Sequence, residues 1–301
     1  MRAVVIRERR LEIEERPDPV PAGGEILIRV RAAGVNAADL MQRAGHYPAP
    51  AGAPADIPGL ECAGEVLQGS SRFRPGDRVM ALLGGGGQAE LVTVHETHVL
   101  PVPLNVDWPQ AGGFMEVFAT AHDALFTQAE LKPGERLLVN GASGGVGVAG
   151  VQLGVAAGAH VTGTVRHHHA ELREFGADTE PSGVYDVVLE LVGGDNLRTD
   201  VEQLATRGRI AVIGAGAGST AEVNFYLLMR ARGRIHGSTL RARSREEKED
   251  VVRRLEGHVG HLLATGLVHV PMEETFPLER AQEAYERFAA GGKFGKIVIC
   301  P

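Results

Sequence analysis

A glycine-rich turn carries the clearest chemical signal in the sequence. Gly141, Gly144 and Gly147 recur at every third position, after the apolar run Arg136–Asn140 and before a helix pattern. The first turn of a helix leaves backbone N–H groups unpaired at the positive end of its dipole, where a diphosphate can bind. Gly144 and Gly145 would let the backbone approach the phosphates, and Gly147 would let the helix pack against the strand. The G-x-x-G-x-x-G spacing differs from the commoner G-x-G-x-x-G, so a structural βα turn in a flavodoxin-like domain is the alternative.

The end of the next strand indicates which dinucleotide such a turn would hold. A site for NADH usually has an Asp or Glu about 20 residues further on, which binds the ribose hydroxyl. The stretch Gly163–His169 contains no carboxylate. Arg166 offers a planar donor fork that suits a 2′-phosphate, and His169 adds a second donor, so we predict NADPH rather than NADH. A metal site on the three consecutive histidines 167–169 is less favoured, because one turn rarely aims three neighbouring rings at one ion.

Charge and composition exclude several classes of protein. The 31 basic residues against 38 acidic ones argue against a nucleic-acid binder. Two cysteines, Cys62 and Cys300, build neither a disulfide framework nor a four-cysteine zinc site. The N-terminus has no signal-peptide pattern, and the apolar stretch Val146–Ala159 falls short of a membrane span. We expect a protein of a reducing compartment, by default the cytoplasm, with no membrane segment.

The elements that must position the turn follow two patterns. The first hundred residues contain short β-rich runs, such as Ile26–Ala32 and Asp77–Leu83, and one helix at Ala37–Arg43 with Asn36 as its cap. Many short strands with glycine turns predict a small barrel or sandwich. In the second hundred residues strand and helix patterns alternate, which is typical of a parallel sheet covered by helices. The tail is expected to add a strand near Val268–Val270, a helix at Leu278–Ala290 and a final strand at Lys296–Cys300.

Several stretches spread over the chain carry a resemblance to a known family. The first is the pattern N-x-x-D-x-x-x-R-x-G-x-Y, from Asn36 to Tyr47. The others, besides the glycine turn, are Pro58–Gly64, Pro75–Val79, Gly84–Glu90, Glu116–Ala121 and Gly292–Val298. In these stretches the sequence resembles the zinc-free quinone oxidoreductase branch (zeta-crystallin-like) of the medium-chain dehydrogenase/reductase superfamily. The resemblance covers nearly the whole chain.

This resemblance implies an α/β protein with two domains. A GroES-like β-barrel domain would comprise residues 1–115 and 251–301, and an inserted NADPH-binding domain of the Rossmann type, a doubly wound parallel sheet, would span residues 116–250. The active site is expected in the cleft between them. Relatives carry an additional strand and helix after the position of Asp178. Only Thr179–Gly183 separate that position from the next strand pattern here, so we predict a sheet trimmed by one edge βα unit.

The same resemblance implies redox chemistry without a metal ion. At two positions where zinc-dependent relatives hold the catalytic ion, this chain has Asn36 and Leu60, and neither supplies the usual ligand. A reduced nicotinamide can pass hydride to a quinone or an α,β-unsaturated carbonyl without a metal. By resemblance, Asn36, Asp39 and Tyr47 would line the catalytic slot, with Tyr47 as the proton donor. The alternatives are a packing role for Tyr47 and a helix cap for Asn36. For Asp39 the favoured interpretation is a structural role, as a helix cap or in an ion pair with Arg43.

Further contacts with the dinucleotide are carried over by position, with ordinary packing as the alternative for each. They are Thr120, Ser143, Val146, Val192, Gly193, Gly214, Ala215, Ser238, Thr239, Leu240, Phe294 and Lys296, the last of which is expected to reach a phosphate. The hypothesis is an NADPH-dependent reductase of quinones or, as second choice, of enones. A non-catalytic NADPH-binding protein is the alternative from another class. Relatives dimerise through the edge strand of the nucleotide sheet, here Arg234–Thr239, so a homodimer is expected.

Overall fold

The computed structural model describes residues 1–301. Their packing separates two compact units: the first comprises Met1–Glu116 and Leu240–Pro301, and the second comprises Val117–Thr239. The boundary that was expected after residue 250 lies earlier. Residues 240–250 belong to the first unit, because the buried side chain of Arg241 makes its hydrogen bonds there.

A seven-stranded sheet forms the centre of the first unit. Its strands follow the order β13-β14-β3-β4-β5-β7, and β6 pairs with the first half of β3. Along β3, the side chains of Ile26, Ile28 and Val30 are buried between more exposed neighbours, which is the period of two that predicts a strand. The bounds are β3 (Glu25–Gly34), β4 (Glu61–Gln68), β5 (Arg78–Leu82), β6 (Leu91–His95), β7 (Val99–Pro101), β13 (Met272–Pro277) and β14 (Lys296–Cys300).

A hairpin and several helices complete the first unit. The prediction of a strand at Val268–Val270 is wrong, because these residues precede β13. The remaining elements are β1 (Arg2–Arg7), β2 (Arg10–Glu15), α1 (Ala37–Arg43), η1 (Glu96–His98), α2 (Trp108–Gly112), α8 (Arg245–Ala264), η3 (Leu278–Arg280) and α9 (Ala281–Ala289). Helix α3 (Met115–His122) crosses the boundary between the units.

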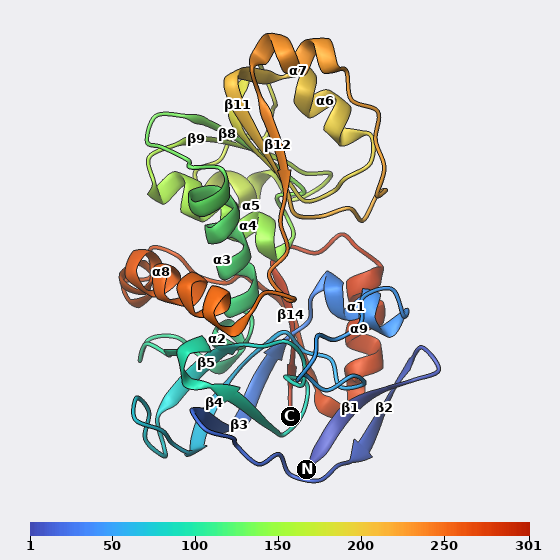
Figure 1. Cartoon of the computed structure of the whole chain (residues 1–301), viewed down its shortest axis with the longest axis vertical. Helices are drawn as coiled ribbons and strands as arrows, with labels where there is room; N and C mark the ends of the chain where they lie inside the picture. The colour runs from blue at the N-terminus through green and yellow to red at the C-terminus, as the bar shows by residue number, and fades with distance from the viewer. The chain divides into compact units, whose positions relative to one another are not determined.

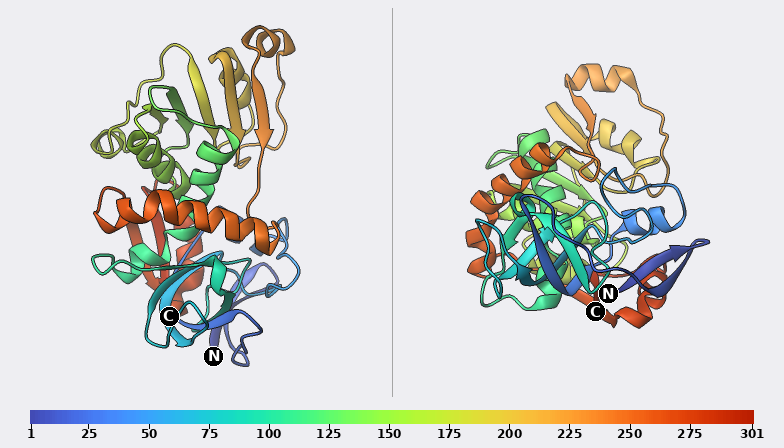
Figure 2. Two further views of the ribbon diagram at one scale, coloured as in Figure 1. Left: turned by 60° about the vertical axis from the view of Figure 1, so that its left-hand side comes forward. Right: turned by 60° about the horizontal axis from the view of Figure 1, so that its bottom comes forward.

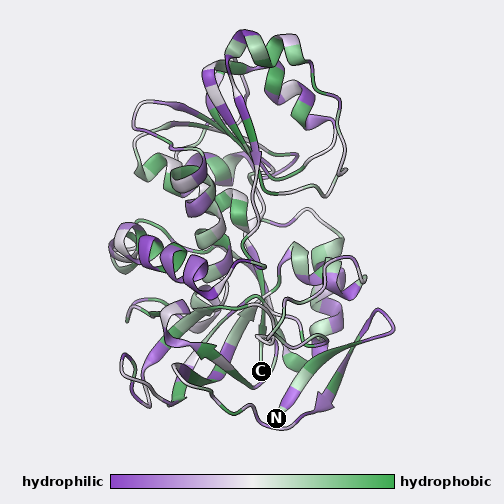
Figure 3. Ribbon diagram, in the orientation of Figure 1, coloured by the Kyte–Doolittle hydropathy of each residue, from purple (hydrophilic) through white to green (hydrophobic).

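The longest helix, α8, is amphipathic. Val251, Leu255 and Val259 form a buried stripe along it, and Figure 3 shows hydrophilic residues alternating with hydrophobic ones on this helix. None of the helices combines the length and the apolar character needed to cross a bilayer.

A five-stranded parallel sheet forms the second unit, and Figure 2 shows its strands side by side. The order is β12-β11-β10-β8-β9. The prediction of a trimmed sheet is confirmed: where a sixth strand would begin, Asp178 forms a lone parallel bridge with Thr162 of β9. The bounds are β8 (Arg136–Asn140), β9 (His160–Thr164), β10 (Tyr185–Glu190), β11 (Leu204–Val212) and β12 (Arg234–Gly237).

Helices cover both faces of this sheet. On one face, Leu138, Val188 and Ile210 pack in a cluster with residues of α6 (Asn196–Glu202) and α7 (Phe225–Ala231). On the other face, glycines of α4 (Gly145–Ala156) lie against Leu137 and Leu189. Successive residues of a strand therefore enter different apolar layers, which explains the continuous apolar runs in the sequence. The unit also contains η2 (Asp123–Gln128), a π-helix, and α5 (His169–Glu174).

Candidate active site

Helix α1 begins at two of the residues that were expected to line the slot. The carboxylate of Asp39 accepts the N–H of Asn36 at 2.8 Å and the N–H of Gly59 at 3.0 Å. Of the two alternatives to a catalytic role for Asp39, the helix cap is confirmed. The ion pair with Arg43 is wrong, because the Arg43 guanidinium lies over the ring of Tyr285, 5.2 Å from its centre. Burial raises the pKa of Asp39 to about 6, although both N–H groups favour its charged form. Asp39 thus ties the start of α1 to the loop before β4.

A buried ammonium group lies next to Asn36. Lys296 Nζ donates hydrogen bonds to Glu61 Oε1 and Asn36 Oδ1, each at 2.7 Å, and to Val35 O at 3.0 Å. The Asn36 side chain completes the cluster by donating from Nδ2 to Glu61 Oε1 at 2.9 Å. The side chain of Lys296 is 3% exposed, and that of Glu61 is fully buried. The prediction that Lys296 reaches a phosphate is therefore corrected, because its ammonium already binds three oxygens inside the first unit.

Glu116 adds a second carboxyl group near this cluster. Its N–H, at the start of α3, donates to Glu61 Oε2 at 2.8 Å. Burial and, next, the charge of Glu61 raise the pKa of the Glu116 carboxyl to about 8, against the opposing effect of Lys296. The carboxyl is therefore mostly protonated at neutral pH. In the sequence, the stretch around Glu116 contributes only to the resemblance, because no local pattern shows that Glu116 contacts Glu61, 55 positions away.

Tyr47 is held by an arginine that the sequence analysis did not single out. The Arg241 guanidinium lies 5.2 Å from the centre of the Tyr47 ring, and its Nη1 donates to Tyr47 O at 3.0 Å. The same group donates to Gly84 O at 2.9 Å and to Gln42 Oε1 at 2.6 Å. Burial raises the pKa of the Tyr47 phenol, so the phenol keeps its proton at neutral pH and can donate it in a hydrogen bond.

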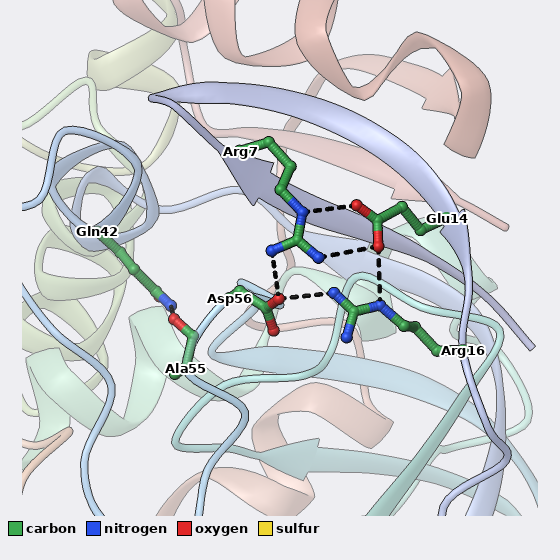
Figure 4. Close-up of polar contacts among 6 residues, drawn as sticks. All are labelled: Arg7, Glu14, Arg16, Gln42, Ala55 and Asp56. Carbon is green, nitrogen blue, oxygen red and sulfur yellow. Dashed lines mark hydrogen bonds and ion pairs between the residues drawn. The ribbon is translucent and has the colours of Figure 1, made fainter.

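The loop that carries Tyr47 is fixed again before it enters β4. Gln42 Nε2 donates to Ala55 O at 3.0 Å. Beside it, Figure 4 shows a closed ring of hydrogen bonds among side chains of alternating charge, namely Arg7, Glu14, Arg16 and Asp56. The ring joins the β1–β2 hairpin to the loop, so that helix, loop and hairpin position Tyr47 together.

The glycine turn in the second unit has the predicted geometry. Helix α4 begins after Gly144, which provides no side chain to cap the first-turn N–H groups. A Cβ atom added at Gly147 would lie 2.4 Å from Gly141 O, so the close approach of helix and strand requires glycine there. Gly141 itself has a φ of 76°, which favours glycine. Ser143 lies in the turn, and Val146 lies in the first turn of the helix.

Other predicted contacts gather at the carboxyl ends of the parallel strands. A Cβ atom at Gly193 would lie 2.6 Å from Cα of Ala215, and one at Gly141 would lie 3.1 Å from the side chain of Val192. A Cβ atom at Gly214 would lie even closer, 2.1 Å from the backbone oxygen of Leu191, which follows β10. Ser238 and Thr239 directly follow β12. Elsewhere in the unit, the hydroxyl oxygen of Thr120 is buried and has no hydrogen-bond partner.

The end of β9 contains the residues that were expected to select NADPH. Arg166 and His169 are both exposed just beyond Thr164, and His169 is the first residue of α5. His168 has a left-handed backbone and a ring nitrogen 2.9 Å from Glu171 Oε1. No three His, Cys, Asp or Glu side chains of the structure are grouped so that they could hold a metal ion.

The remaining two predicted contacts lie in the first unit. Leu240 is buried, next to Arg241. Phe294 is partly buried, and its N–H donates to Glu273 Oε2 at 3.0 Å.

Comparison with known proteins identifies the family. Two family models match: one described as an alcohol dehydrogenase GroES-like domain at residues 22–104, and one described as a zinc-binding dehydrogenase at residues 160–299. The quinone oxidoreductase of Rattus norvegicus is 30% identical, over 93% of this chain and 90% of that protein. The chain belongs to the quinone oxidoreductase branch of the medium-chain dehydrogenase/reductase superfamily. The quinone oxidoreductase of Pseudomonas aeruginosa is 29% identical, over 97% and 95% of the two chains.

Solved structures of this superfamily agree with the fold. The quinone oxidoreductase of Thermus thermophilus, solved alone and in complex with NADPH, is 30% identical and has a TM-score of 0.85 over the whole of both chains. The quinone oxidoreductase of Pseudomonas syringae is 25% identical, with a TM-score of 0.88. The chain is thus an oxidoreductase of an NAD(P)-binding superfamily, with a GroES-like domain and a Rossmann-type sheet.

Proposed function

We propose that this member of the quinone oxidoreductase branch is an NADPH-dependent quinone oxidoreductase that works without a metal ion. The observation that carries the proposal is the 30% identity, over the full length of both chains, with a quinone oxidoreductase solved in complex with NADPH. The exchange of metal-ligand positions for Asn36 and the buried Leu60 supports the metal-free part of the proposal.

The second unit contains the residues that would hold NADPH. The uncapped N–H groups around Ser143–Gly147 suit the diphosphate, and the unpartnered hydroxyl of Thr120 is a buried polar atom that a ligand could satisfy. Arg166 and His169 are free to meet a 2′-phosphate at the end of β9, where a carboxylate would have favoured NADH. The backbone around Val192–Gly193 and Gly214–Ala215 would line the rest of the site.

The first unit contains the residues that would orient the acceptor. NADPH supplies a hydride when bound, and the protein has to present an electron-poor acceptor to it. Tyr47 would donate a hydrogen bond from its phenol to the acceptor oxygen, which stabilises the negative charge that develops there. Asn36 would adjoin this site. Asp39 was expected to line it as well, but its side chain is fully buried and instead holds the start of α1 in place.

The test is to follow NADPH absorbance with 1,2-naphthoquinone and, separately, with an alkenal. We expect faster oxidation with the quinone, and weaker binding of NADH than of NADPH. Tyr47→Phe should lower kcat by about 100-fold, the lower end of the contribution of a general acid. The matched control is Tyr285→Phe, because the Tyr285 hydroxyl is buried and is already used in a hydrogen bond to Gln88 Oε1 at 2.9 Å. It should lower stability without lowering kcat in the same proportion.

Two results would replace this proposal with its alternatives. Faster turnover of the alkenal would indicate an enone reductase. Tight binding of NADPH without turnover of any acceptor would indicate a non-catalytic NADPH-binding protein. One relative whose name is not that of an enzyme supports this second candidate. That relative, the synaptic vesicle membrane protein VAT-1 homolog of Rattus norvegicus, is 27% identical over 97% of this chain. Failure to bind NADPH would contradict the proposal itself.

We also propose a homodimer formed through the edge of the nucleotide sheet. Strand β12 is an edge strand, and the helix that precedes it exposes Phe225, Tyr226 and Met229 at 69% or more. Unpaired edge groups and an exposed apolar helix face both favour association. Sedimentation at micromolar concentration should give twice the chain mass of 31.9 kDa, and a value equal to one chain would contradict the dimer.

A further inference from the structure

Two buried carboxyl groups meet beneath the predicted dinucleotide site. Glu190, the last residue of β10, and Asp200, in α6, are 0% and 1% exposed. Asn140, the last residue of β8, bridges them: its Nδ2 donates to Glu190 Oε2 at 2.6 Å and to Asp200 Oδ1 at 2.7 Å. The cluster therefore joins two parallel strands and a helix within the second unit.

The two carboxyl groups differ in how many N–H groups they accept. Glu190 Oε1 accepts the N–H of Val192 at 2.5 Å and the N–H of Gly193 at 2.7 Å, in addition to the amide of Asn140 at Oε2. Asp200 accepts only the amide of Asn140, and its Oδ2 has no partner among the N–H donors. Three N–H bonds stabilise a carboxylate, whereas a buried oxygen without a donor is stable only when it is protonated. The proton therefore belongs on Asp200.

The electrostatics of the site agree with this assignment. Burial and, next, the hydrogen bond and charge of the adjacent Glu190 raise the pKa of Asp200 to about 8, whereas the amide of Asn140 opposes the shift. Glu190 is the only charged group that acts on Asp200. The neighbouring polar group is the Thr164 hydroxyl of β9, which donates to Asn140 Oδ1 at 3.0 Å.

The hydrogen bonds of the cluster extend to both turns of the site. Through Glu190 it holds the N–H groups of Val192 and Gly193, and through Thr164 it reaches the N–H of Gly141 at 3.2 Å, where the glycine turn begins. Because Gly193 packs closely on the backbone of Ala215, a shift of this turn would move the loop after β11 as well.

We propose that Asp200 is kept as a neutral acid sharing its proton with the Glu190 carboxylate, and that this pair is the positioning element that fixes the Val192–Gly193 turn for the dinucleotide. The inference rests on the proposed function for its ligand, but not for the state of the pair. When Asp200 loses its proton, two adjacent carboxylates repel each other with only Asn140 between them. The turn then loses its fixed position and binds the dinucleotide less well.

The expected effect on binding follows from the population of the neutral form. If only that form binds and Asp200 titrates at about 8, the dissociation constant for NADPH rises roughly 30-fold between pH 7 and pH 9.5. The stability of the protein without dinucleotide changes in the same sense. The folded state keeps a proton that the unfolded state loses above the usual aspartate pKa of 3.8, so the free energy of unfolding falls as the pH rises from about 4 to about 8.

The test compares Asp200→Asn, which cannot ionise, with Asp195→Asn on the same helix, where the aspartate is exposed. Thermal midpoints without dinucleotide are measured from pH 5 to pH 8, and NADPH dissociation constants from fluorescence are measured from pH 7 to pH 9.5. Asp200→Asn should abolish the rise of the NADPH dissociation constant and should reduce the fall of the thermal midpoint, to which Glu116 also contributes. Asp195→Asn should keep the slopes of the unmodified protein. Equal slopes in all three proteins would overturn the inference. Absence of NADPH binding at pH 7 would instead count against the proposed cofactor, because the thermal slopes need no ligand.

A second measurement covers the case in which Asp200→Asn does not fold. In the Glu116→Gln background, which removes the other carboxyl with a pKa near 8, the infrared band of a protonated carboxylic acid is followed from pH 7 to pH 9.5. We expect a band at pH 7 that disappears with a midpoint near pH 8. No band at pH 7 would overturn the inference.

Discussion

The two units of the chain bury carboxyl groups in opposite ways. In the first unit, Glu61 lies against the ammonium of Lys296, and Asn36 binds both. In the second unit, Glu190 lies against another carboxyl, that of Asp200, and no cation acts on Asp200. A buried carboxylate needs a partner that offsets its charge, because desolvation is costly. A lysine therefore offsets the charge of a buried carboxylate at every physiological pH, whereas a shared proton does so only below the pKa of Asp200.

Lys296→Met should have the largest effect, because it tests the lysine that offsets the charge of Glu61. The substitution leaves Glu61 buried without a cation and should lower the free energy of unfolding by about 3 to 5 kcal/mol. Urea denaturation at pH 7 measures the loss. The matched control is Arg253→Met, whose ion pair with Asp250 is exposed and should contribute about 1 kcal/mol or less. Equal losses in the two variants would show that burial gives the Lys296 pair no special importance.

Arg241→Met tests a buried cation whose acceptors are neutral. It removes the hydrogen bonds to Gln42, Tyr47 and Gly84 but strands no carboxylate, so the loss should be smaller than for Lys296→Met, about 2 to 3 kcal/mol. Arg241→Lys keeps the charge but not the planar donor fork, and should recover only part of the stability. Chemical denaturation gives the ranking. Full recovery by lysine would show that charge, and not the geometry of the donors, holds the Tyr47 loop.

Gly147→Ala tests the backbone approach in the second unit. The added Cβ would lie 2.4 Å from Gly141 O, so α4 must shift, at a cost of about 1 to 2 kcal/mol, and NADPH binding should weaken with it. Gly257→Ala in α8 is the control, because nothing lies within 4 Å of its Cβ position. That variant should gain about 0.5 to 1 kcal/mol from helix propensity. Thermal midpoints and NADPH titrations of both variants measure the difference. Normal NADPH binding by Gly147→Ala would contradict the prediction.

Glu116→Gln tests whether a carboxyl group of the first unit is also protonated in the folded protein. The folded carboxyl, with a pKa raised from 4.5 to about 8, keeps a proton that the unfolded chain loses. The free energy of unfolding should therefore fall as the pH rises from about 4.5 to about 8, and the variant should lack this part of the fall. The effect should be the smallest of the four, because glutamine has the size of the neutral acid that it replaces. Urea midpoints at pH 5 and pH 8.5 measure it, and parallel changes in both proteins would contradict it.

Local patterns predicted much of the fold. Helix α1 and strand β14 have the bounds that the sequence predicted, because a capped helix start and a run of β-branched residues are local signals. The strand expected at Val268–Val270 is wrong, because an apolar run of three residues does not define its pairing partner. The domain boundary was displaced because the hydrogen-bond partners of Arg241 lie far away in the sequence.

The candidate site was predictable only in part. The glycine turn was found because strand, turn and helix are contiguous, and Gly147 meets Gly141 six residues away. Two roles of charged residues were wrong, the Asp39–Arg43 pair and the phosphate contact of Lys296. The i, i+4 spacing on a helix allows an Asp39–Arg43 pair, and the resemblance places Lys296 near a phosphate. Neither signal shows that other groups of the folded protein lie closer to these side chains.

The sequence by itself determined the class of fold, the trimmed sheet and the glycine turn that suits a dinucleotide, since each depends on the order of short segments along the chain. The tertiary structure alone decided the partners of the buried charges. Glu61 meets Lys296 across 235 positions, and Asp200 meets Asn140 across 60. A buried charge is stable only next to a polar or charged partner, and the packing of the folded chain determines which group lies within hydrogen-bond distance. The spacing of residues along the chain does not predict these partners.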